Sequence, residues 1–133
     1  MAYTLKTGKT YTDPHGGSHS SAYAVFYQIN GNSRNNRKDK NLTLEIFRTE
    51  AGAKNGEAPY ENHSFTVKNE GDNTHYDDYF STTELSKLNK NPKKGAYSYL
   101  DMVMQAEIDD EVNKHNGVRG GFKWEDWETD EKG

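Results

Sequence analysis

The sequence predicts an α+β fold: a mainly antiparallel β-sheet, as a small sandwich or open barrel, with one or two C-terminal helices packed on it. Three observations support this prediction. Apolar and polar residues alternate in residues 42–46 and 63–67, with the period of two that a half-buried strand requires. Between residues 96 and 108, apolar residues recur at spacings of three and four, as on one helix face. Aromatic residues make up 12% of a chain that is only 31% hydrophobic, and their rings can form a core that few aliphatic residues supply.

The chain is expected to form one domain, because 133 residues are too few for two stable cores. We predict an N-terminal arm or edge strand and loop at residues 1–20, a single β-rich domain with helices at 21–117, and an acidic C-terminal tail at 118–133. Residues 107–133 hold nine acidic and four basic residues, a local balance of 4 − 9 = −5. With so few aliphatic residues, the domain is expected to gain stability from neighbouring subunits.

A β-hairpin is the economical topology for residues 21–46. Residues 21–29 are predicted to form its first strand, which Asn30-Gly31 ends, and residues 42–46 its second. The first strand is expected to place Tyr23, Val25, Tyr27 and Ile29 on one face, and Ala24 and Phe26 on the other.

The polar loop of this hairpin, residues 30–41, is a candidate contact finger because it is longer than a tight turn needs. It carries the basic residues Arg34, Arg37, Lys38 and Lys40. A solvated loop tip is one interpretation, contact with another protein a second, and phosphate binding a third. The sequence has no basic stripe of the kind typical of nucleic-acid binders, so we expect no nucleic-acid partner.

Helical signals begin at residues 49–56, which predict a helical turn stopped by Gly56. Ser81 and Glu84 form a capping box, and Asn91-Pro92 predicts the start of a longer helix. The apolar stripe expected on that helix comprises Ala96, Leu100, Val103, Met104 and Ile108. The acidic residues around His75 lack the pattern of a calcium-binding loop, so residues 70–78 are predicted to be a polar turn.

Residues 13–19 hold the most tempting group of possible metal ligands, Asp13, His15 and His19. The two histidines would share one face of a helix, but Gly16-Gly17 between them favours an exposed flexible loop. The chain contains no cysteine, no phosphate-binding glycine loop and no nucleophile elbow. We therefore expect no enzymatic activity, no metal and no cofactor.

The C-terminal segment contains Phe122, Trp124 and Trp127 among acidic residues. These rings are predicted to dock on a neighbouring subunit, the rings supplying contact area and the carboxylates the register. The alternative is that they fold back over the protein's own core. Exposed Trp and Tyr could also stack on sugars. The N-terminus has no apolar leader, and no apolar run is long enough to span a membrane, so no membrane contact is expected.

The middle of the chain resembles small virion proteins encoded among the neck, tail and baseplate genes of tailed bacteriophages. The resemblance covers residues 21–100 and begins with the stretch LTLEIFRTEAGAKNGEAP at 42–59, a strand followed by an Ala-rich turn near a proline. YFS at 79–81 and NP at 91–92, leading to AYSYL at 96–100, fit the same arrangement.

This resemblance implies a non-enzymatic structural protein of the tail, baseplate or neck, made in the host cytoplasm and located in the virion. Its partners would be other virion proteins and copies of itself, with no small-molecule ligand. A glycan- or receptor-binding module using exposed Tyr and Trp is the alternative function. A metal-dependent hydrolase using Asp13, His15 and His19 is a third hypothesis.

Overall fold

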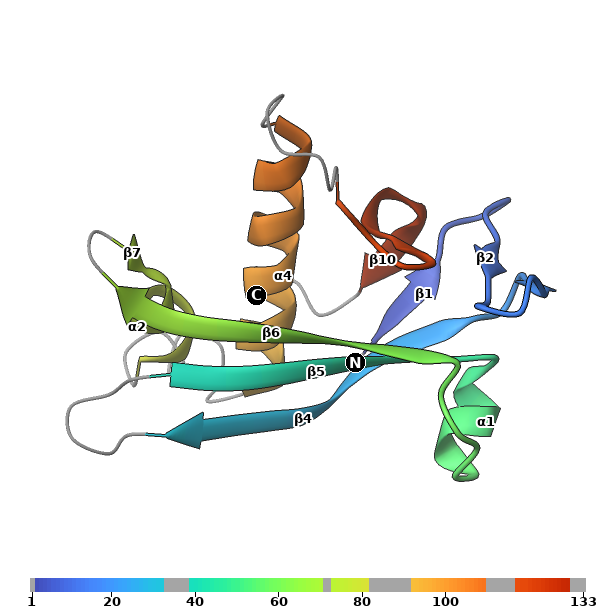
Figure 1. Cartoon of the computed structure of the whole chain (residues 1–133), viewed down its shortest axis with the longest axis horizontal. Helices are drawn as coiled ribbons and strands as arrows, with labels where there is room; N and C mark the ends of the chain where they lie inside the picture. Colours follow the sequence, from blue (N-terminus) through green and yellow to red (C-terminus); the bar gives the residue numbers. More distant parts are fainter. Residues whose placement is uncertain (1, 33–38, 71–72, 82–91, 110–116, 130–133) are drawn as a thin grey trace.

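A curled antiparallel sheet wraps partly around one long helix, in the manner of a half-barrel (Figure 1). The computed structural model describes residues 2–32, 39–70, 73–81, 92–109 and 117–129. All strand pairs in these residues are antiparallel. The predicted α+β class, with a mainly antiparallel sheet and a C-terminal helix packed on it, is confirmed, and the sheet has the open-barrel form.

The main sheet has six strands. In spatial order they are β10 (Trp127–Thr129), β1 (Tyr3–Leu5), β4 (Tyr23–Asn32), β5 (Asp39–Phe47), β6 (Glu61–Glu70) and β7 (Asn73–Thr74). Two small hairpins accompany it, β2 (Tyr11–Thr12) with β3 (Ser18–His19), and β8 (Val118–Arg119) with β9 (Phe122–Lys123). The helices are α1 (Glu50–Lys54), α2 (His75–Phe80), α4 (Pro92–Asp109) and the 3-10 turn η2 (Trp124–Asp126).

The two ends of the chain belong to the same sheet. β1 lies between β10 and β4 and pairs with both, with Leu5 opposite Trp127 and Tyr3 opposite Ala24. Residues 3–5 are therefore an inner strand and not the predicted arm or edge strand. Residues 118–129 are likewise joined to the sheet and core, so the predicted boundary at residue 117 falls inside one packed unit.

The predicted β4–β5 hairpin is present, but its first strand is longer and less regular than expected. Asn30-Gly31 do not end β4, which continues to Asn32 opposite Asp39. A β-bulge between Phe26 and Gln28 shifts the register and reverses the alternation of faces. As a result, Ile29 packs against the main core and not with Tyr23 and Val25 as predicted.

The main core lies between the concave face of the sheet and α4, and aromatic rings dominate it. The period-two prediction for residues 42–46 is confirmed, since Leu42, Leu44 and Ile46 are fully buried. They meet the α4 side chains Ala96, Tyr97, Tyr99, Leu100 and Met104, together with Tyr3, Tyr11, Phe26, Phe80, Phe122 and Trp127. Tyr97 packs edge-on against Tyr3, with ring centroids 5.2 Å apart. Of the predicted apolar stripe, Ala96, Leu100 and Met104 thus face the sheet and Val103 packs against the same core, whereas Ile108 lines a pocket.

A second, smaller core lies on the other face of the sheet, beneath α1. Val25, Phe47, Ala2 and Ala53 form it. The Thr49 hydroxyl accepts a hydrogen bond from the Gly52 N–H at 3.0 Å and so caps the start of α1. The predicted helical turn is confirmed.

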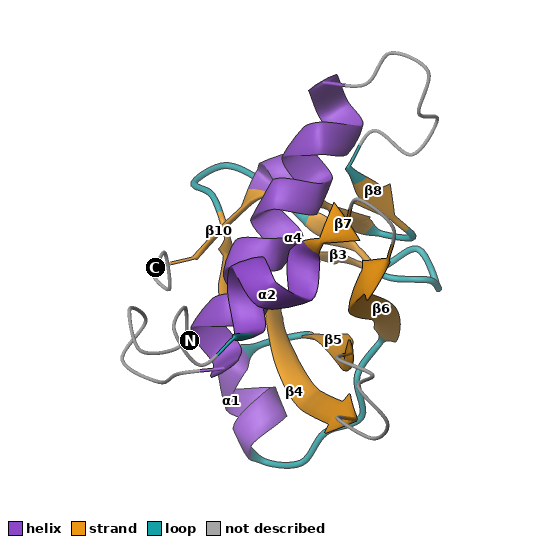
Figure 2. Ribbon diagram, turned by 90° about the vertical axis from the view of Figure 1, so that its left-hand side faces the viewer, coloured by secondary structure: helices purple, strands orange, loops and turns teal. Residues whose placement is uncertain are grey.

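Residues 75–78, expected as part of a polar turn, lie in the helix α2, which extends from His75 to Phe80. Phe80 is buried in the main core and Tyr76 packs beside it, so burial of these rings outweighs the local turn preference of the acidic residues. Figure 2 shows α2 lying beside α4. The predicted capping box of Ser81 and Glu84 extends outside the described residues.

Candidate functional site

The C-terminal aromatic residues are divided between the core and a pocket. Phe122 is fully buried and Trp127 is 4% exposed, with their rings 5.3 Å apart, so both cover the protein's own core. This is the alternative to subunit docking that the sequence left open, and the predicted interface role of these two residues does not fit their burial. Trp124 is only half-buried and lines a pocket.

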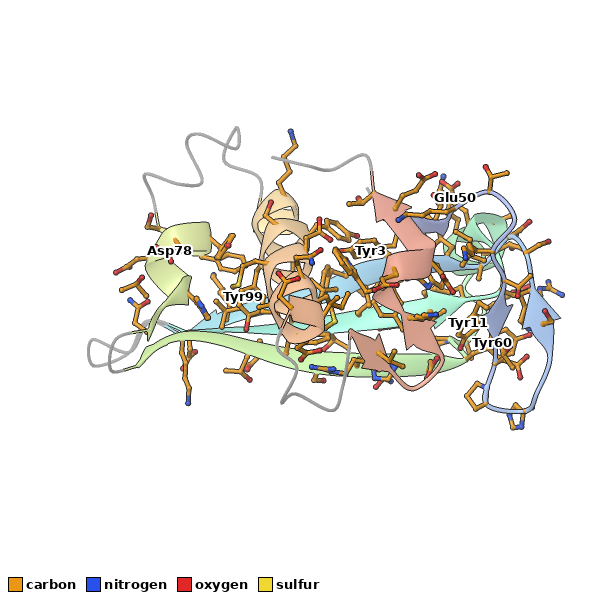
Figure 3. The ribbon with its side chains drawn as sticks, turned by 90° about the horizontal axis from the view of Figure 1, so that it is seen from above. Tyr3, Tyr11, Glu50, Tyr60, Asp78 and Tyr99 are labelled. Atoms are coloured by element: carbon orange, nitrogen blue, oxygen red, sulfur yellow. The ribbon has the colours of Figure 1, made fainter. Side chains whose placement is uncertain are left out.

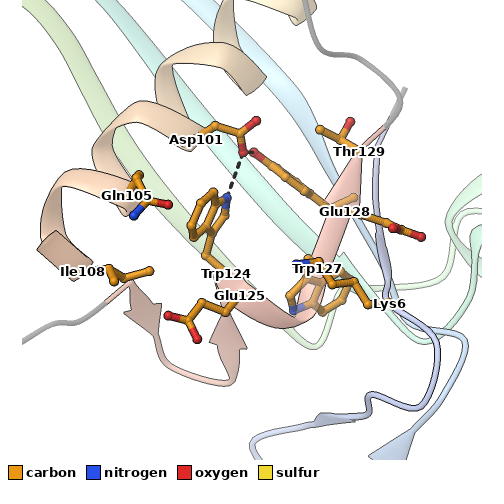
Figure 4. A pocket seen from close by; sticks show the side chains of 10 residues that line it. Lys6, Asp101, Gln105, Ile108, Trp124, Glu125, Trp127, Glu128 and Thr129 are labelled. Atoms are coloured by element: carbon orange, nitrogen blue, oxygen red, sulfur yellow. Dashed lines mark hydrogen bonds between the residues drawn. The ribbon is translucent and has the colours of Figure 1, made fainter.

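The pocket has a volume of about 810 Å³ and opens between α4 and the segment η2–β10. Figure 4 shows residues of α4 on one side, residues of η2 and β10 on the other, and the Trp124 indole between them. Its walls consist of Tyr3, Lys6, Asp101, Gln105, Ile108, Trp124, Glu125, Trp127, Glu128 and Thr129. The strand pairing of β10 with β1 brings Tyr3 and Lys6 to this site, far in sequence from the other residues of the walls.

Asp101 fixes the position of the indole. Its Oδ1 atom accepts hydrogen bonds from Trp124 Nε1 at 2.8 Å and from the Tyr3 hydroxyl at 2.7 Å. Burial and the negative charge of Asp101 raise the pKa of Tyr3 well above its ordinary value, so the hydroxyl stays a donor even in alkaline solution. The Asp101 carboxylate is therefore held by the Tyr3 hydroxyl, and it fixes the orientation of the Trp124 ring.

The rim of the pocket is polar and acidic. Asp101, Glu125 and Glu128 contribute three carboxylates and Lys6 one ammonium group, a balance of 1 − 3 = −2. Gln105 lies one helical turn after Asp101 and donates from Nε2 to Asp109 Oδ1 at 2.9 Å. The rim thus offers both hydrogen-bond donors and acceptors around an aromatic wall.

Asp13, His15 and His19, the predicted group of metal ligands, lie in a turn that hydrogen bonds hold together. Asp13 is buried, and its Oδ1 atom accepts the backbone N–H groups of His15 at 2.7 Å and Gly17 at 3.0 Å. Its Oδ2 atom lies 2.6 Å from His19 Nε2. The loop is thus an ordered turn held by Asp13, and not the exposed flexible loop predicted. Among the residues that the structure describes, no three His, Cys, Asp or Glu side chains are placed to hold a metal ion.

A network that the sequence did not reveal surrounds this turn. Tyr60 stacks on His19 with ring centroids 4.9 Å apart. The Tyr11 hydroxyl donates to Glu61 Oε1 at 2.8 Å, and Glu61 Oε2 lies 3.2 Å from His63 Nε2. Figure 3 shows Tyr11 and Tyr60 together at the end of the sheet opposite Asp78.

The only sequence signal for this network was the inward position of Glu61 and His63 on β6, two residues apart. Placing polar side chains at inward positions requires partners, because a buried polar group without a hydrogen bond is costly. Those partners, Tyr11 and the Gly121 N–H, come from other parts of the chain.

The predicted basic interface is only partly within the described chain. Arg34, Arg37 and Lys38 lie outside the described residues. Lys40 is half-buried in β5, opposite Gly31 of β4 and Val67 of β6. It belongs to the hairpin strand rather than to its loop.

Comparisons of the chain with protein-family profiles, with curated protein sequences and with solved structures gave no significant match. Among the described helices, none is both long enough and apolar enough to cross a membrane.

Proposed function

We propose that this protein is a non-enzymatic structural subunit of a bacteriophage particle, in the tail, baseplate or neck, and that it joins copies of itself and other virion proteins. The resemblance of residues 21–100 supports the particle context. The observation that supports subunit contact is the outer edge of β6.

On its inner side β6 pairs with β5 along residues 61–68. On its outer side, within the described chain, β7 pairs only with Asn69 and Glu70. Among the residues that the structure describes, 61–67 therefore form a sheet edge with which no strand other than β5 pairs. Backbone N–H and C=O groups of such an edge are ready to pair with a strand of another molecule.

The side chains on this edge suit a regulated contact better than indiscriminate aggregation. Asn62, Ser64 and Thr66 are exposed and polar, whereas the alternate residues point to the core face. The Thr66 carbonyl accepts a long hydrogen bond, 3.5 Å, from the Tyr99 hydroxyl. A polar edge forms a contact mainly through its backbone, with side chains setting the register.

A two-fold axis through Ser64 gives the simplest pairing. An antiparallel contact centred there places Asn62 opposite Thr66 of the second copy and keeps the concave faces of both sheets on the same side. Both members of that pair can form hydrogen bonds and neither is charged, so no like charges face each other.

The absence of cysteine from the chain makes a direct test possible. In Ser64→Cys, the new thiols of two copies would lie opposite each other across the axis, within the distance that a disulfide spans. We expect rapid covalent dimer formation under mild oxidation, measured by non-reducing gel electrophoresis and native mass spectrometry. Asn41→Cys, exposed on the inner strand β5, is the matched control and should react much more slowly.

A second variant tests the same edge without a thiol. Asn62→Lys combined with Ser64→Lys places four like charges across the pairing, and we expect at least a tenfold weaker self-association by analytical ultracentrifugation. Asn41→Lys is the control. An unchanged protein that stays monomeric at high concentration, and a Ser64→Cys variant no more reactive than the control, would contradict the proposal.

A further inference from the structure

We infer that the pocket between α4 and β10 binds a neutral saccharide, with one sugar ring stacked on Trp124. This inference is independent of the β6 edge. It rests on four features of the pocket: an aromatic wall, a fixed orientation of that wall, a mixed polar rim and a net negative charge.

Trp124 provides the wall. A sugar ring presents C–H groups on its faces, which pack well on an indole surface that is apolar and electron-rich. The indole N–H is already bound to Asp101 at 2.8 Å, so the ring is held in place before a ligand arrives. Because Asp101 also accepts the Tyr3 hydroxyl, two bonds fix the group that orients the ring. Such preorganisation reduces the entropy lost on binding.

The rim matches the hydroxyl groups of a sugar. Each hydroxyl can donate one hydrogen bond and accept others, so its site needs both kinds of partner. Glu125 and Glu128 supply acceptors, Lys6 a donor, and Gln105 both. Ile108 adds an apolar surface beside the indole.

The charge and the volume of the pocket indicate which class of ligand it binds. Three carboxylates against one ammonium group disfavour a phosphorylated or carboxylated sugar, since like charges repel. A small cation would also suit an indole beside carboxylates, so the experiment below includes tetramethylammonium as the competing ligand. The volume of about 810 Å³ falls in the usual range for small-molecule sites, and it accommodates more than one sugar ring.

The experiment uses the full chain on an array of neutral oligosaccharides, followed by calorimetric titration of the best binder. We expect saturable binding that weakens at least tenfold in Trp124→Ala and in Glu125→Ala. Tyr27→Ala is the matched control, since Tyr27 is an exposed ring on the other face of the sheet, and it should bind as the unchanged protein does. Near-ultraviolet circular dichroism checks that each variant is folded.

Glu125 is exposed, so Glu125→Ala keeps the test valid if Trp124→Ala fails to fold. No saturable binding of any neutral saccharide on the array would overturn the inference. So would equal binding by the unchanged protein and a folded pocket variant, or preference for tetramethylammonium over every saccharide. The double variant Asn62→Lys with Ser64→Lys should keep its sugar binding, which separates this site from the proposed subunit contact.

Discussion

At the scale of single residues, the most informative feature is the use of tyrosine hydroxyls and carboxylates inside an aromatic core. Tyr3 and Tyr11 are both buried, and each donates to one carboxylate, Asp101 or Glu61. An aromatic ring with a polar end can fill a core and still satisfy a neighbouring acid. This explains how a chain poor in aliphatic residues builds a core with interior hydrogen bonds.

Tyr3 makes stability sensitive to alkaline pH. Its pKa is raised by burial first and then by Asp101, so the folded protein favours the protonated form. The stabilisation is complete below the unfolded tyrosine pKa of about 10 and is lost as pH rises above it. In Tyr3→Phe we expect a loss of about 1–3 kcal/mol at neutral pH and a weaker further loss between pH 10 and 12, measured by urea unfolding.

Tyr11→Phe is the comparison for that measurement, because the pKa of Tyr11 is also raised, by burial first and then by the bond to Glu61. It should likewise reduce the alkaline loss. Identical pH profiles above pH 10 for the unchanged protein and both variants would contradict this explanation.

Asp13 should act at the opposite end of the pH scale. The bond to His19 is the main cause that lowers the pKa of Asp13, and the backbone N–H groups of Gly17 and His15 add to it. A lowered folded pKa stabilises the protein above the unfolded value, about 3.9, and this contribution disappears as pH falls through the folded pKa. In Asp13→Asn, we expect lower stability at pH 7 and less further loss below pH 4, measured by thermal unfolding. A variant with the same acid sensitivity as the unchanged protein would contradict it.

At the scale of elements, two helices meet where a side chain is missing. Gly95, in the first turns of α4, faces α2: a Cβ atom built there would lie 2.6 Å from the Tyr79 carbonyl oxygen and 3.2 Å from the Phe80 ring. Contact this close between backbones requires glycine. It also explains why a residue of poor helix propensity is placed inside α4.

Gly95→Ala should therefore destabilise the protein although alanine favours helices. Overpacking typically costs about 1–3 kcal/mol, while the gain in helix propensity is about 1 kcal/mol. We expect a net loss in chemical unfolding and faster amide exchange in α2. Lys94→Ala, at a half-buried neighbouring position, serves as the control and should stay within about 0.5 kcal/mol. A Gly95→Ala variant more stable than the unchanged protein would contradict this prediction, because it would show that α2 can move away from α4 at little cost in free energy.

At the scale of the whole molecule, the sheet is completed by its two ends. β10 pairs with β1, while Phe122 and Trp127 fill the core beside Tyr3 and Tyr11. The acidic C-terminal segment is thus an integral part of the fold. Its acidic side chains Glu125 and Glu128 are exposed, while Phe122 and Trp127 are buried in the core.

Removal of residues 122–133 should consequently abolish cooperative folding. The deletion takes the two strands β9 and β10 and two buried rings. The loss of a single buried Phe or Trp side chain already costs about 3–5 kcal/mol. Circular dichroism and heteronuclear NMR would show an unfolded or molten chain. Removal of residues 130–133 alone is the control, since these residues follow the end of β10 and the strand itself is kept. A folded, cooperative protein after the longer deletion would contradict this role of the ends.

The sequence by itself determined the features whose causes lie within a few neighbouring residues. Alternation at residues 42–46 identified a buried strand, Thr49 and Gly56 delimited a short helix, and the stripe from Ala96 identified the face of α4. Caps, turns and periodic faces depend on residues up to about four positions apart, so a local pattern records them.

Only the tertiary structure decided the bulge in β4, the inner position of β1, the helix α2 and the pocket at Trp124. The hydrogen bond from Tyr3 to Asp101 joins residues 98 positions apart, and the bond from Tyr11 to Glu61 joins residues 50 apart. Such contacts form because side chains from distant segments must pack together to bury their apolar surface. The free energy gained by burying an aromatic ring exceeds the local preference of a few residues for a turn. No local pattern specifies which distant partner satisfies a given ring or carboxylate.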